Sequence, residues 1–277
     1  MADWYFDGAR VEQIPIDDRG FQYADGLFET VAIRDGEARL WPLHMDRLRQ
    51  GCDALHIEMP PQQELGERLS QALAVSAAPT ERCIAKIIVT AGSGERGYGR
   101  AVAPPAVWIG VFEAMQPSAT MYQEGVAATI CATRLATGSP TAGLKTLART
   151  EQVLARSELE TFEGLMMDAD ERLICGTMSN VFFVREKSIS TPALDRCGVA
   201  GVMRHHVMTC LESRGRPVSV EDTYRTDLEH IDEIFISNSQ IGVVPVAICG
   251  NVHWGVGAIT RNVMALMADN GIAECRA

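Results

Sequence analysis

The irregular succession of short apolar strands and amphipathic helices is the feature that most constrains the fold of this chain. Residues 27–33 and 38–41 flank Asp35-Gly36, a dipeptide that favours a tight β-hairpin. The periodicity predicts further strands over residues 4–6, 83–90, 107–112, 126–132, 233–237 and 243–248, and helices over residues 43–55, 62–77, 149–162 and 256–269, with another helix beginning near Gly201. Because no strict strand–helix–strand rhythm links them, we expect an α+β fold with antiparallel pairing.

The length of 277 residues suits two compact domains. The small and polar stretch over residues 115–120 separates two periodic halves and is the best candidate for a linker. We therefore expect a small N-terminal domain over residues 1–118 and a larger C-terminal domain over residues 119–277.

The composition excludes several classes of function. A formal net charge of −11 argues against binding to nucleic acid or to anionic lipid. No apolar run is long enough to span a bilayer, and the first residues lack the pattern of a signal peptide, so we expect a cytoplasmic protein with no membrane partner. The 8 cysteines follow no metal-ligand spacing, so we expect no metal site, and we expect most of them to be small buried apolar residues.

Lysine is rare in this chain, which narrows the search for a nucleophilic amine to Lys86, Lys145 and Lys187. Lys145 precedes a predicted helix among small and apolar neighbours, where a neutral amine that attacks a carbonyl is favoured. A solvated lysine at a helix start is the alternative. Strand alternation predicts that Lys86 turns outward, and Lys187 falls in a polar turn.

Residues 92–97 match the dinucleotide-binding pattern G-x-G-x-x-G, but no helix pattern follows them. Pro104-Pro105 lead instead into another strand, so we expect a hairpin loop. The loop carries Arg96, Tyr98 and Arg100, and its arginines could gather a carboxylate substrate. A solvated surface turn is the alternative.

Two further segments have the pattern of anion-binding sites. Residues 198–204 run through two glycines into a helix, so the backbone N–H groups of Val202 and Met203 could hold a phosphate. Residues 237–240 end a strand with four hydrogen-bonding side chains. Each segment could equally be an ordinary cap or turn. Together with a candidate nucleophilic lysine, they indicate a phosphorylated aldehyde cofactor.

Six motifs in this order resemble the fold type IV pyridoxal phosphate enzymes. They are residues 23–30 (YADGLFET), 44–48 (HMDRL), 94–98 (GERGY), 145–153 (KTLARTEQV), 176–182 (GTMSNVF) and 198–204 (GVAGVMR). The resemblance implies a two-lobed α+β fold with mixed and antiparallel sheets, pyridoxal 5′-phosphate bound between the lobes, and a homodimer.

The resemblance also implies roles for individual positions. Lys145 would hold the cofactor covalently and then transfer protons, with Thr30 as a second catalytic residue. Thr30, Arg96 and Tyr98 would face the substrate. The positions implied in cofactor binding are Lys145, Arg47, Glu151, Cys175, Asn180, Val202, Met203 and Ser239.

Within that superfamily, the loop around Arg96 and the segment 145–153 are most similar to those of the aminodeoxychorismate lyases. That similarity implies a small dicarboxylate substrate, 4-amino-4-deoxychorismate, which is cleaved to 4-aminobenzoate and pyruvate for folate synthesis. A branched-chain or D-amino acid aminotransferase remains an alternative. A catalytically silent member with a regulatory or binding role is another.

Two positions depart from the pattern of the resembled enzymes. Cys175 stands where relatives place a glutamate that pairs with the cofactor's ring nitrogen, and a thiol is a poorer partner for a protonated ring. A weaker electron sink hinders amino transfer more than an elimination that creates an aromatic ring, so we expect this substitution to favour lyase activity. Damaged or altered activity is the alternative reading of Cys175. Ala148 stands where an asparagine is common in lyases, and this departure concerns the substrate contacts near Lys145.

Overall fold

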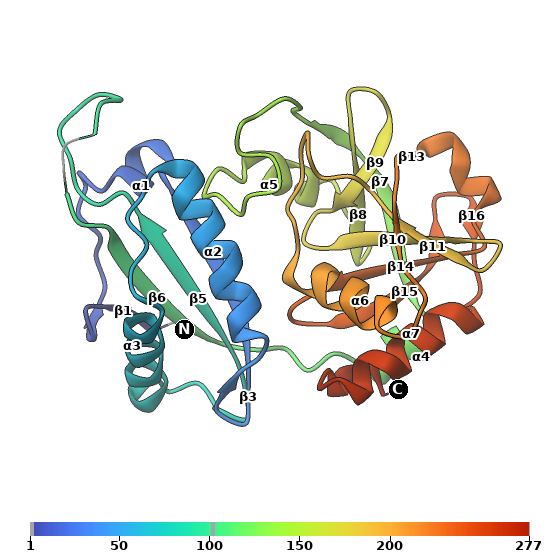
Figure 1. The fold of residues 1–277 in the computed structure, drawn as a ribbon, viewed down its shortest axis with the longest axis horizontal. Coiled ribbons are helices and arrows are strands. Elements are labelled where there is room, and N and C mark those ends of the chain that lie inside the picture. Colours follow the sequence, from blue (N-terminus) through green and yellow to red (C-terminus); the bar gives the residue numbers. More distant parts are fainter. Residues whose placement is uncertain (1–2, 101–102, 277) are drawn as a thin grey trace. The chain divides into compact units, whose positions relative to one another are not determined.

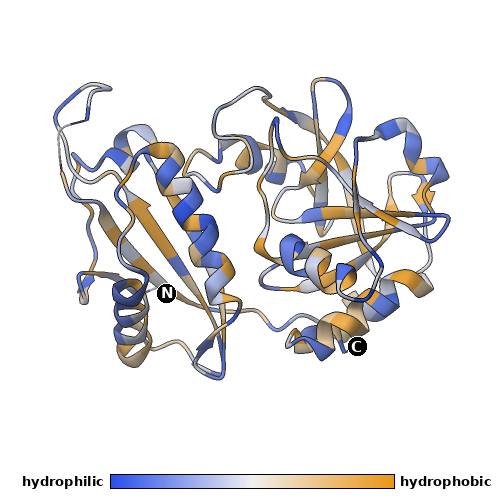
Figure 2. Cartoon of the chain, viewed as in Figure 1, coloured by the Kyte–Doolittle hydropathy of each residue, from blue (hydrophilic) through white to orange (hydrophobic). Residues whose placement is uncertain are grey.

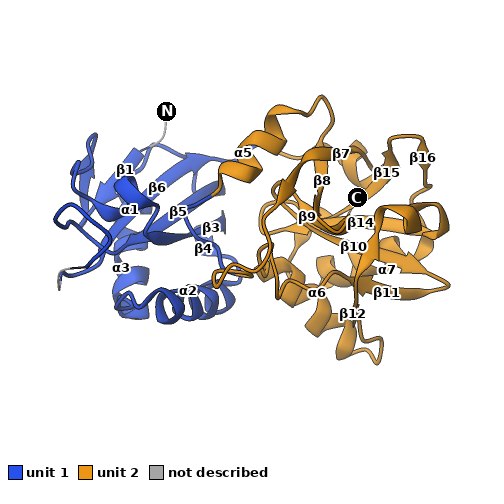
Figure 3. Ribbon diagram, turned by 90° about the horizontal axis from the view of Figure 1, so that it is seen from above, with its two compact units in different colours: residues 1–115, 144–148 blue, residues 116–143, 149–277 orange. Residues whose placement is uncertain are grey.

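The computed structural model describes residues 3–100 and 103–276 (Figure 1). Residues 1, 2 and 277, at the outer ends of the two expected domains, and residues 101 and 102 lie outside the described part. The chain divides into two compact units (Figure 3). Unit 1 comprises Met1–Met115 and Leu144–Ala148, and unit 2 comprises Gln116–Gly143 and Arg149–Ala277. The short segment that carries Lys145 thus groups with unit 1, whereas the sequence analysis had placed it in the C-terminal domain.

Unit 1 is built around a six-stranded sheet in the order β2-β1-β6-β5-β3-β4, in which every neighbouring pair is antiparallel. The elements of this unit are β1 Asp3–Phe6, β2 Ala9–Val11, α1 Arg19–Tyr23, β3 Gly26–Arg34, β4 Glu37–Ala38, α2 Trp41–Leu55, α3 Gln62–Val75, β5 Arg82–Thr90 and β6 Ala106–Glu113. Asp35 and Gly36 both have positive φ and form the predicted hairpin between β3 and β4.

The core of unit 1 lies on one face of this sheet. In β5, Cys83, Ala85, Ile87 and Val89 are fully buried, and they alternate with half-buried residues. Met45, Leu48 and Cys52 of α2 and Leu65 and Leu69 of α3 pack into the same cluster. The two helices therefore cover the core face, and even-numbered β5 residues such as Lys86 point to the other face.

Unit 2 contains a 10-stranded mixed sheet, in which the pairs β7–β8, β7–β15 and β11–β12 are parallel. Its strands are β7 Val126–Leu135, β8 Glu163–Asp168, β9 Arg172–Gly176, β10 Asn180–Arg185, β11 Ser188–Thr191, β12 Ser219–Val220, β13 Thr223–Tyr224, β14 Glu233–Asn238, β15 Gly242–Cys249 and β16 Val252–His253. Its helices are α4 Ala119–Gln123, α5 Thr150–Ser157, α6 Val202–Glu212 and α7 Ala258–Asp269, with 3₁₀ turns η1 Arg225–His230 and η2 Ala273–Cys275. Figure 2 shows apolar residues concentrated on the strands of both sheets.

The α+β expectation, with antiparallel and mixed sheets, is confirmed. The glycine-rich segment over residues 92–97 connects two antiparallel neighbours, β5 and β6, and contains no helix, as expected for a hairpin loop. The predicted helix over residues 149–162 is shorter than expected, because α5 ends at Ser157. All 8 cysteines are buried and free. Within residues 3–100 and 103–276, no helix combines the length and the apolar character needed to cross a membrane.

Candidate functional site

The segment Leu144–Ala148 lies along the start of β3. The backbone N–H of Phe28 donates to the carbonyl of Lys145 at 3.0 Å, and the N–H of Leu147 donates to the carbonyl of Gly26 at 3.0 Å. Leu27 and Thr146 form an antiparallel bridge between these two bonds. The backbone on both sides of Lys145 is therefore fixed to the strand that carries the motif of residues 23–30.

The side chain of Lys145 lies over the ring of Phe28, with Nζ 4.4 Å from the ring centroid. Lys86 Nζ lies 5.0 Å from the same centroid, and burial lowers the pKa of Lys86. Thr30 is two residues beyond Phe28 and directly opposite Lys86 in the β3–β5 ladder, so its side chain is on the same face of the sheet. Two of the chain's three lysines thus lie against one aromatic ring, on the sheet face that also carries Thr30. Strand alternation had predicted that Lys86 turns outward, but it had not indicated that Lys86 lies near Lys145.

On the core face of β3, Glu29 binds two residues of α2. Its carboxylate accepts hydrogen bonds from Arg47 Nε at 2.8 Å and from Arg47 Nη2 at 2.5 Å. His44 Nδ1 lies 2.5 Å from Glu29 Oε2. Glu29 and His44 are almost completely buried, with exposed fractions of 1% and 0%. Both residues lie within the motifs of residues 23–30 and 44–48, but no role was predicted for either of them.

The charge states in this cluster follow from its burial and its pairing. Burial raises the pKa of Glu29, but the Arg47 charge and the His44 hydrogen bond outweigh it and lower the pKa to about 2. Burial is the largest influence on His44 and lowers its pKa, so the imidazole is neutral near pH 7. Its Nδ1 then donates to the Glu29 carboxylate, and its buried Nε2 has no hydrogen-bond partner. The cluster therefore fixes the direction of the Arg47 guanidinium.

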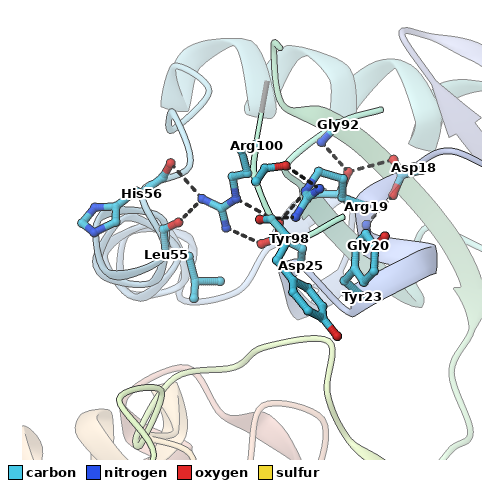
Figure 4. A network of polar contacts seen from close by, with 12 residues as sticks. Asp18, Arg19, Gly20, Tyr23, Asp25, Leu55, His56, Gly92, Tyr98 and Arg100 are labelled. Atoms are coloured by element: carbon cyan, nitrogen blue, oxygen red, sulfur yellow. Dashed lines mark hydrogen bonds and ion pairs between the residues drawn. The ribbon is translucent and has the colours of Figure 1, made fainter. Parts of the chain in front are cut away.

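The β5–β6 loop presents Arg96 and Tyr98 at the surface of unit 1. Both residues are exposed, and the side chain of Tyr98 is 90% exposed. The expectation that Arg100 also gathers a substrate carboxylate is wrong. Its guanidinium is occupied by both carboxylate oxygens of Asp25 and by the carbonyls of Leu55 and His56 (Figure 4).

In unit 2, α6 begins directly after Gly201, and no side chain caps its first turn. Val202 and Met203 have buried side chains, so their backbone N–H groups are the parts available to an anion. Asn180 Nδ2 donates to the carbonyl of Val199 at 2.9 Å, which holds the preceding turn against β10. A Cβ at position 201 would lie 1.9 Å from Asn180 Oδ1, so this close approach requires glycine.

Ser237 adds a buried donor on the same face of unit 2. It lies directly opposite Asn180 in the β10–β14 ladder, so the two side chains are neighbours. Ser237 has an exposed fraction of 0%, and its Oγ has no hydrogen-bond partner. Ser239 is half-buried in the turn that follows, where Asn238 Oδ1 accepts bonds from the N–H groups of Gln240 and Ile241. Both serines lie in the segment 237–240 that the sequence indicated; Ser239 was the implied ligand, and the strand register adds Ser237.

Glu151 and Cys175 occupy different surroundings in unit 2. Glu151 lies in the first turn of α5 and accepts a bond from the N–H of Ala136 at 3.0 Å. Cys175 packs in an apolar cluster with Cys131, Met166 and Cys197, among others. Burial, followed by the negative charge of Glu163, raises the pKa of Cys175 far above its usual range. The thiol is therefore neutral.

Glu163 is a fully buried acid that the sequence analysis missed. Its carboxylate accepts hydrogen bonds from the backbone and hydroxyl of Thr177, from Ser179 Oγ at 2.7 Å and from the N–H of Gly164. These donors satisfy the carboxylate within the strand end and the turn that follows Cys175. Glu163 therefore organises this turn, and no spacing pattern in the sequence indicated it.

The described residues fit the chemistry of pyridoxal phosphate. Unit 2 has three features that are typical of phosphate-binding sites. They are the uncapped start of α6, the close approach at Gly201 that leaves no room for a Cβ, and the buried Ser237 hydroxyl, which has no hydrogen-bond partner. Unit 1 supplies a lysine fixed beside an aromatic ring and an arginine whose fork is oriented by a buried carboxylate. Each unit, taken by itself, therefore carries groups of the kind that bind a phosphorylated aldehyde.

Comparison with known proteins identifies the relatives of this chain. Residues 26–249 match the family Amino-transferase class IV. The chain is 33% identical to an aminodeoxychorismate lyase from Vibrio harveyi, over 94% of this chain and 97% of that protein.

Solved structures have the same fold. The crystal structure of 4-amino-4-deoxychorismate lyase from Pseudomonas aeruginosa superposes with a TM-score of 0.90 at 38% identity, covering 97% of this chain and 99% of that one. A hypothetical aminotransferase from Mycobacterium tuberculosis, in its PLP-bound form, superposes with a TM-score of 0.79 at 18% identity over 100% of both chains. The chain therefore belongs to the class IV aminotransferase family, whose members are fold type IV pyridoxal phosphate enzymes.

Proposed function

We propose that this chain is a pyridoxal phosphate-dependent lyase that converts 4-amino-4-deoxychorismate into 4-aminobenzoate and pyruvate. The observation that carries the proposal is the fixed position of Lys145 over the Phe28 ring, on the sheet face that also bears Thr30. The similarity to two aminodeoxychorismate lyases, at 33% and 38% identity over nearly the whole chain, supports the choice of substrate.

In unit 1, Lys145 would carry the cofactor and Arg47 would bind its phosphate. In unit 2, the N–H groups of Val202 and Met203 and the hydroxyl of Ser239 are the proposed phosphate ligands. Glu151, Asn180 and Cys175 would surround its ring. The bound cofactor supplies an electron sink for the bond cleavage.

The chain's own residues would then move the protons. The Lys145 amine would take the proton from the substrate ring carbon that bears the amino group. The C–O bond on the neighbouring ring carbon would break with its electron pair as the ring becomes aromatic, and the departing enolpyruvate would take up a proton on its methylene carbon to become pyruvate. Thr30 lies on the same sheet face, and its hydroxyl, which carries an exchangeable proton, would face the substrate. Arg96 and Tyr98 would bind the substrate carboxylates from the β5–β6 loop.

The test is an assay of the purified protein with 4-amino-4-deoxychorismate and pyridoxal phosphate, without any 2-oxo acid. We expect equal amounts of 4-aminobenzoate and pyruvate, and a visible absorption band of the bound cofactor that borohydride removes. Lys145→Ala should lose both the band and the activity, while Lys187→Ala, in an exposed turn, should retain both.

Two outcomes would contradict the proposal. Amino transfer to a 2-oxo acid as the main activity would indicate an aminotransferase with branched-chain or D-amino acid substrates. The absence of both a cofactor band and any product would indicate a silent member of the family.

A further inference from the structure

Arg19 binds the β5–β6 loop through three successive backbone carbonyls (Figure 4). Arg19 Nη1 donates to Gly97 O at 3.0 Å and to Gly99 O at 3.3 Å, and Arg19 Nη2 donates to Tyr98 O at 3.3 Å. Arg19 is 4% exposed, although it is charged. Because the loop carbonyls converge on this buried guanidinium, the backbone of the loop is held at the point where Tyr98 projects outward.

Asp25 joins Arg19 to a second arginine. Its Oδ2 accepts from Arg19 Nε at 2.9 Å and from Arg100 Nε at 2.9 Å, and its Oδ1 accepts from Arg100 Nη2. Burial raises the pKa of Asp25, but the hydrogen bonds from Arg100 and Arg19 outweigh it and lower the pKa. Arg100 also donates to the carbonyls of Leu55 and His56, where α2 ends. The Asp25 carboxylate thus joins Arg19, which holds the carbonyls of residues 97–99, to Arg100 of the same loop.

Tyr23 completes this group of contacts, which we call the Arg19 clamp (Arg19, Tyr23, Asp25 and Arg100). The hydroxyl of Tyr23 accepts a bond from the N–H of Gly97 at 3.0 Å. The Tyr23 ring stacks edge-on against Tyr98 at 5.7 Å, and the Arg19 guanidinium lies 4.9 Å from the Tyr23 centroid. The clamp therefore satisfies the loop backbone without using the side chain of Arg96 or the hydroxyl of Tyr98.

The clamp is anchored to the strand that fixes Lys145. Asp25 immediately precedes β3, and its carbonyl accepts a bond from the N–H of Ala91 at 3.0 Å. The adjacent Gly26 carbonyl accepts the bond from Leu147, which holds the Lys145 segment. A displacement of Asp25 would therefore move the loop relative to Lys145 within unit 1.

We propose that Arg19 and Asp25 are positioning residues that present Arg96 and Tyr98 to the dicarboxylate substrate. This inference rests on the proposed function. Arg19 is suited to the role because its planar fork has five donors, enough for one carboxylate and three carbonyls, whereas a lysine offers one nitrogen. The clamp acts on substrate binding and leaves the cofactor contacts unchanged.

The first measurement is the steady-state kinetics of Arg19→Met and Arg19→Lys with 4-amino-4-deoxychorismate. We expect both variants to raise KM by about tenfold or more, to change kcat by less than about threefold, and to bind pyridoxal phosphate as the parent does. Arg19→Lys keeps the charge, so rescue by it would show that charge alone matters and would overturn the inference. Arg49→Ala, which removes an exposed ion pair with Asp46 on α2, is the matched control.

The second measurement does not depend on activity. Brief trypsin treatment of the native protein, read by mass spectrometry, reports how readily the bond between Arg96 and Gly97 is cut. We expect Arg19→Met to speed this cleavage at least about tenfold, since it frees three backbone carbonyls, and Arg49→Ala to leave it unchanged. If Arg19→Met does not fold, the same cleavage is measured in Arg100→Met, which removes the exposed part of the clamp and should also speed the cleavage.

The outcomes separate the two proposals. Faster cleavage with an unchanged KM would show that the loop is clamped but does not bind substrate, and would overturn the inference. Unchanged cleavage would overturn the clamp itself. A parent protein that forms no 4-aminobenzoate would refute the proposed function and with it this substrate, while the cleavage rates would still decide whether Arg19 holds the loop.

Discussion

The carboxylate of Glu29 and the guanidinium of Arg47 form a two-point ion pair, with Nε–Oε1 at 2.8 Å and Nη2–Oε2 at 2.5 Å. The pair joins β3 to α2, and its acid is 1% exposed. Such a pair is costly to break from one side, because the remaining charge stays buried without its partner. The geometry of Arg47, the expected phosphate ligand, therefore depends on Glu29.

Glu29→Gln should weaken the binding of pyridoxal phosphate by about tenfold, because an amide cannot hold both Arg47 donors in the same direction. Absorbance titration of the apoprotein measures the affinity. Pyridoxal, which lacks the phosphate, should bind the variant and the parent about equally. Glu64→Gln is the matched control, since Glu64 pairs with Arg68 on the exposed face of α3 and its loss should change little. Equal phosphate-dependent affinity in Glu29→Gln and the parent would exclude this role.

The Glu29–Arg47 pair should also make the free energy of unfolding depend on pH in the acid range. The pKa of Glu29 is about 2 in the folded state, below its ordinary value of 4.5, so the unfolded chain binds the proton more readily between these values. Glu29 therefore contributes about 3 kcal/mol above pH 4.5, and this contribution is lost as the pH falls toward 2. Urea unfolding of the parent and of Glu29→Gln across this range measures it. A pH slope that is the same in both proteins would contradict the expectation.

Local sequence signals predicted most of the elements and singled out Lys145 as the candidate nucleophile, but they did not predict the pairing between distant segments. Because the chain has only three lysines, Lys145 was selected before its surroundings were known. Alternation placed Lys86 on the correct side of its strand, yet that side carries Phe28 and Lys145 rather than open solvent. Whether this face of the sheet is covered depends on segments about 60 residues away in the chain. The periodicity of a single strand does not predict which distant segments will lie against it.

Arg100 and Ser237 illustrate the same limit. Arg100 was expected to gather a substrate, but its counter-ion, Asp25, lies 75 residues earlier in the chain. Ser237 belonged to the candidate segment 237–240, but only its register opposite Asn180 and its lack of a hydrogen-bond partner distinguish it from Ser239. Short motifs identify which residues could act, while long-range pairing decides which of them are already satisfied.

Cys175→Glu should raise amino transfer relative to lyase activity. The buried thiol carries no charge, whereas a carboxylate beside the cofactor's ring nitrogen would keep the ring protonated and strengthen its electron sink. The ratio of 2-oxo acid amination to 4-aminobenzoate formation measures the effect, and Cys175→Ser, which adds no charge, is the control. An unchanged ratio in a folded, cofactor-loaded variant would show that position 175 does not tune the ring.

Ser237→Ala should weaken the binding of pyridoxal phosphate without lowering the stability of the apoprotein. Its buried hydroxyl has no partner, which costs about 1–3 kcal/mol, so its removal should leave the melting temperature of the apoprotein unchanged or higher. A hydrogen bond to a phosphate would be lost at the same time, so the affinity for pyridoxal phosphate should fall about tenfold, while that for pyridoxal stays the same. Ser179→Ala is the control, because its hydroxyl donates to Glu163 at 2.7 Å and its loss should destabilise the apoprotein. Thermal denaturation and absorbance titration of both variants decide the matter, and an unchanged phosphate-dependent affinity in Ser237→Ala would exclude Ser237 from the phosphate cradle.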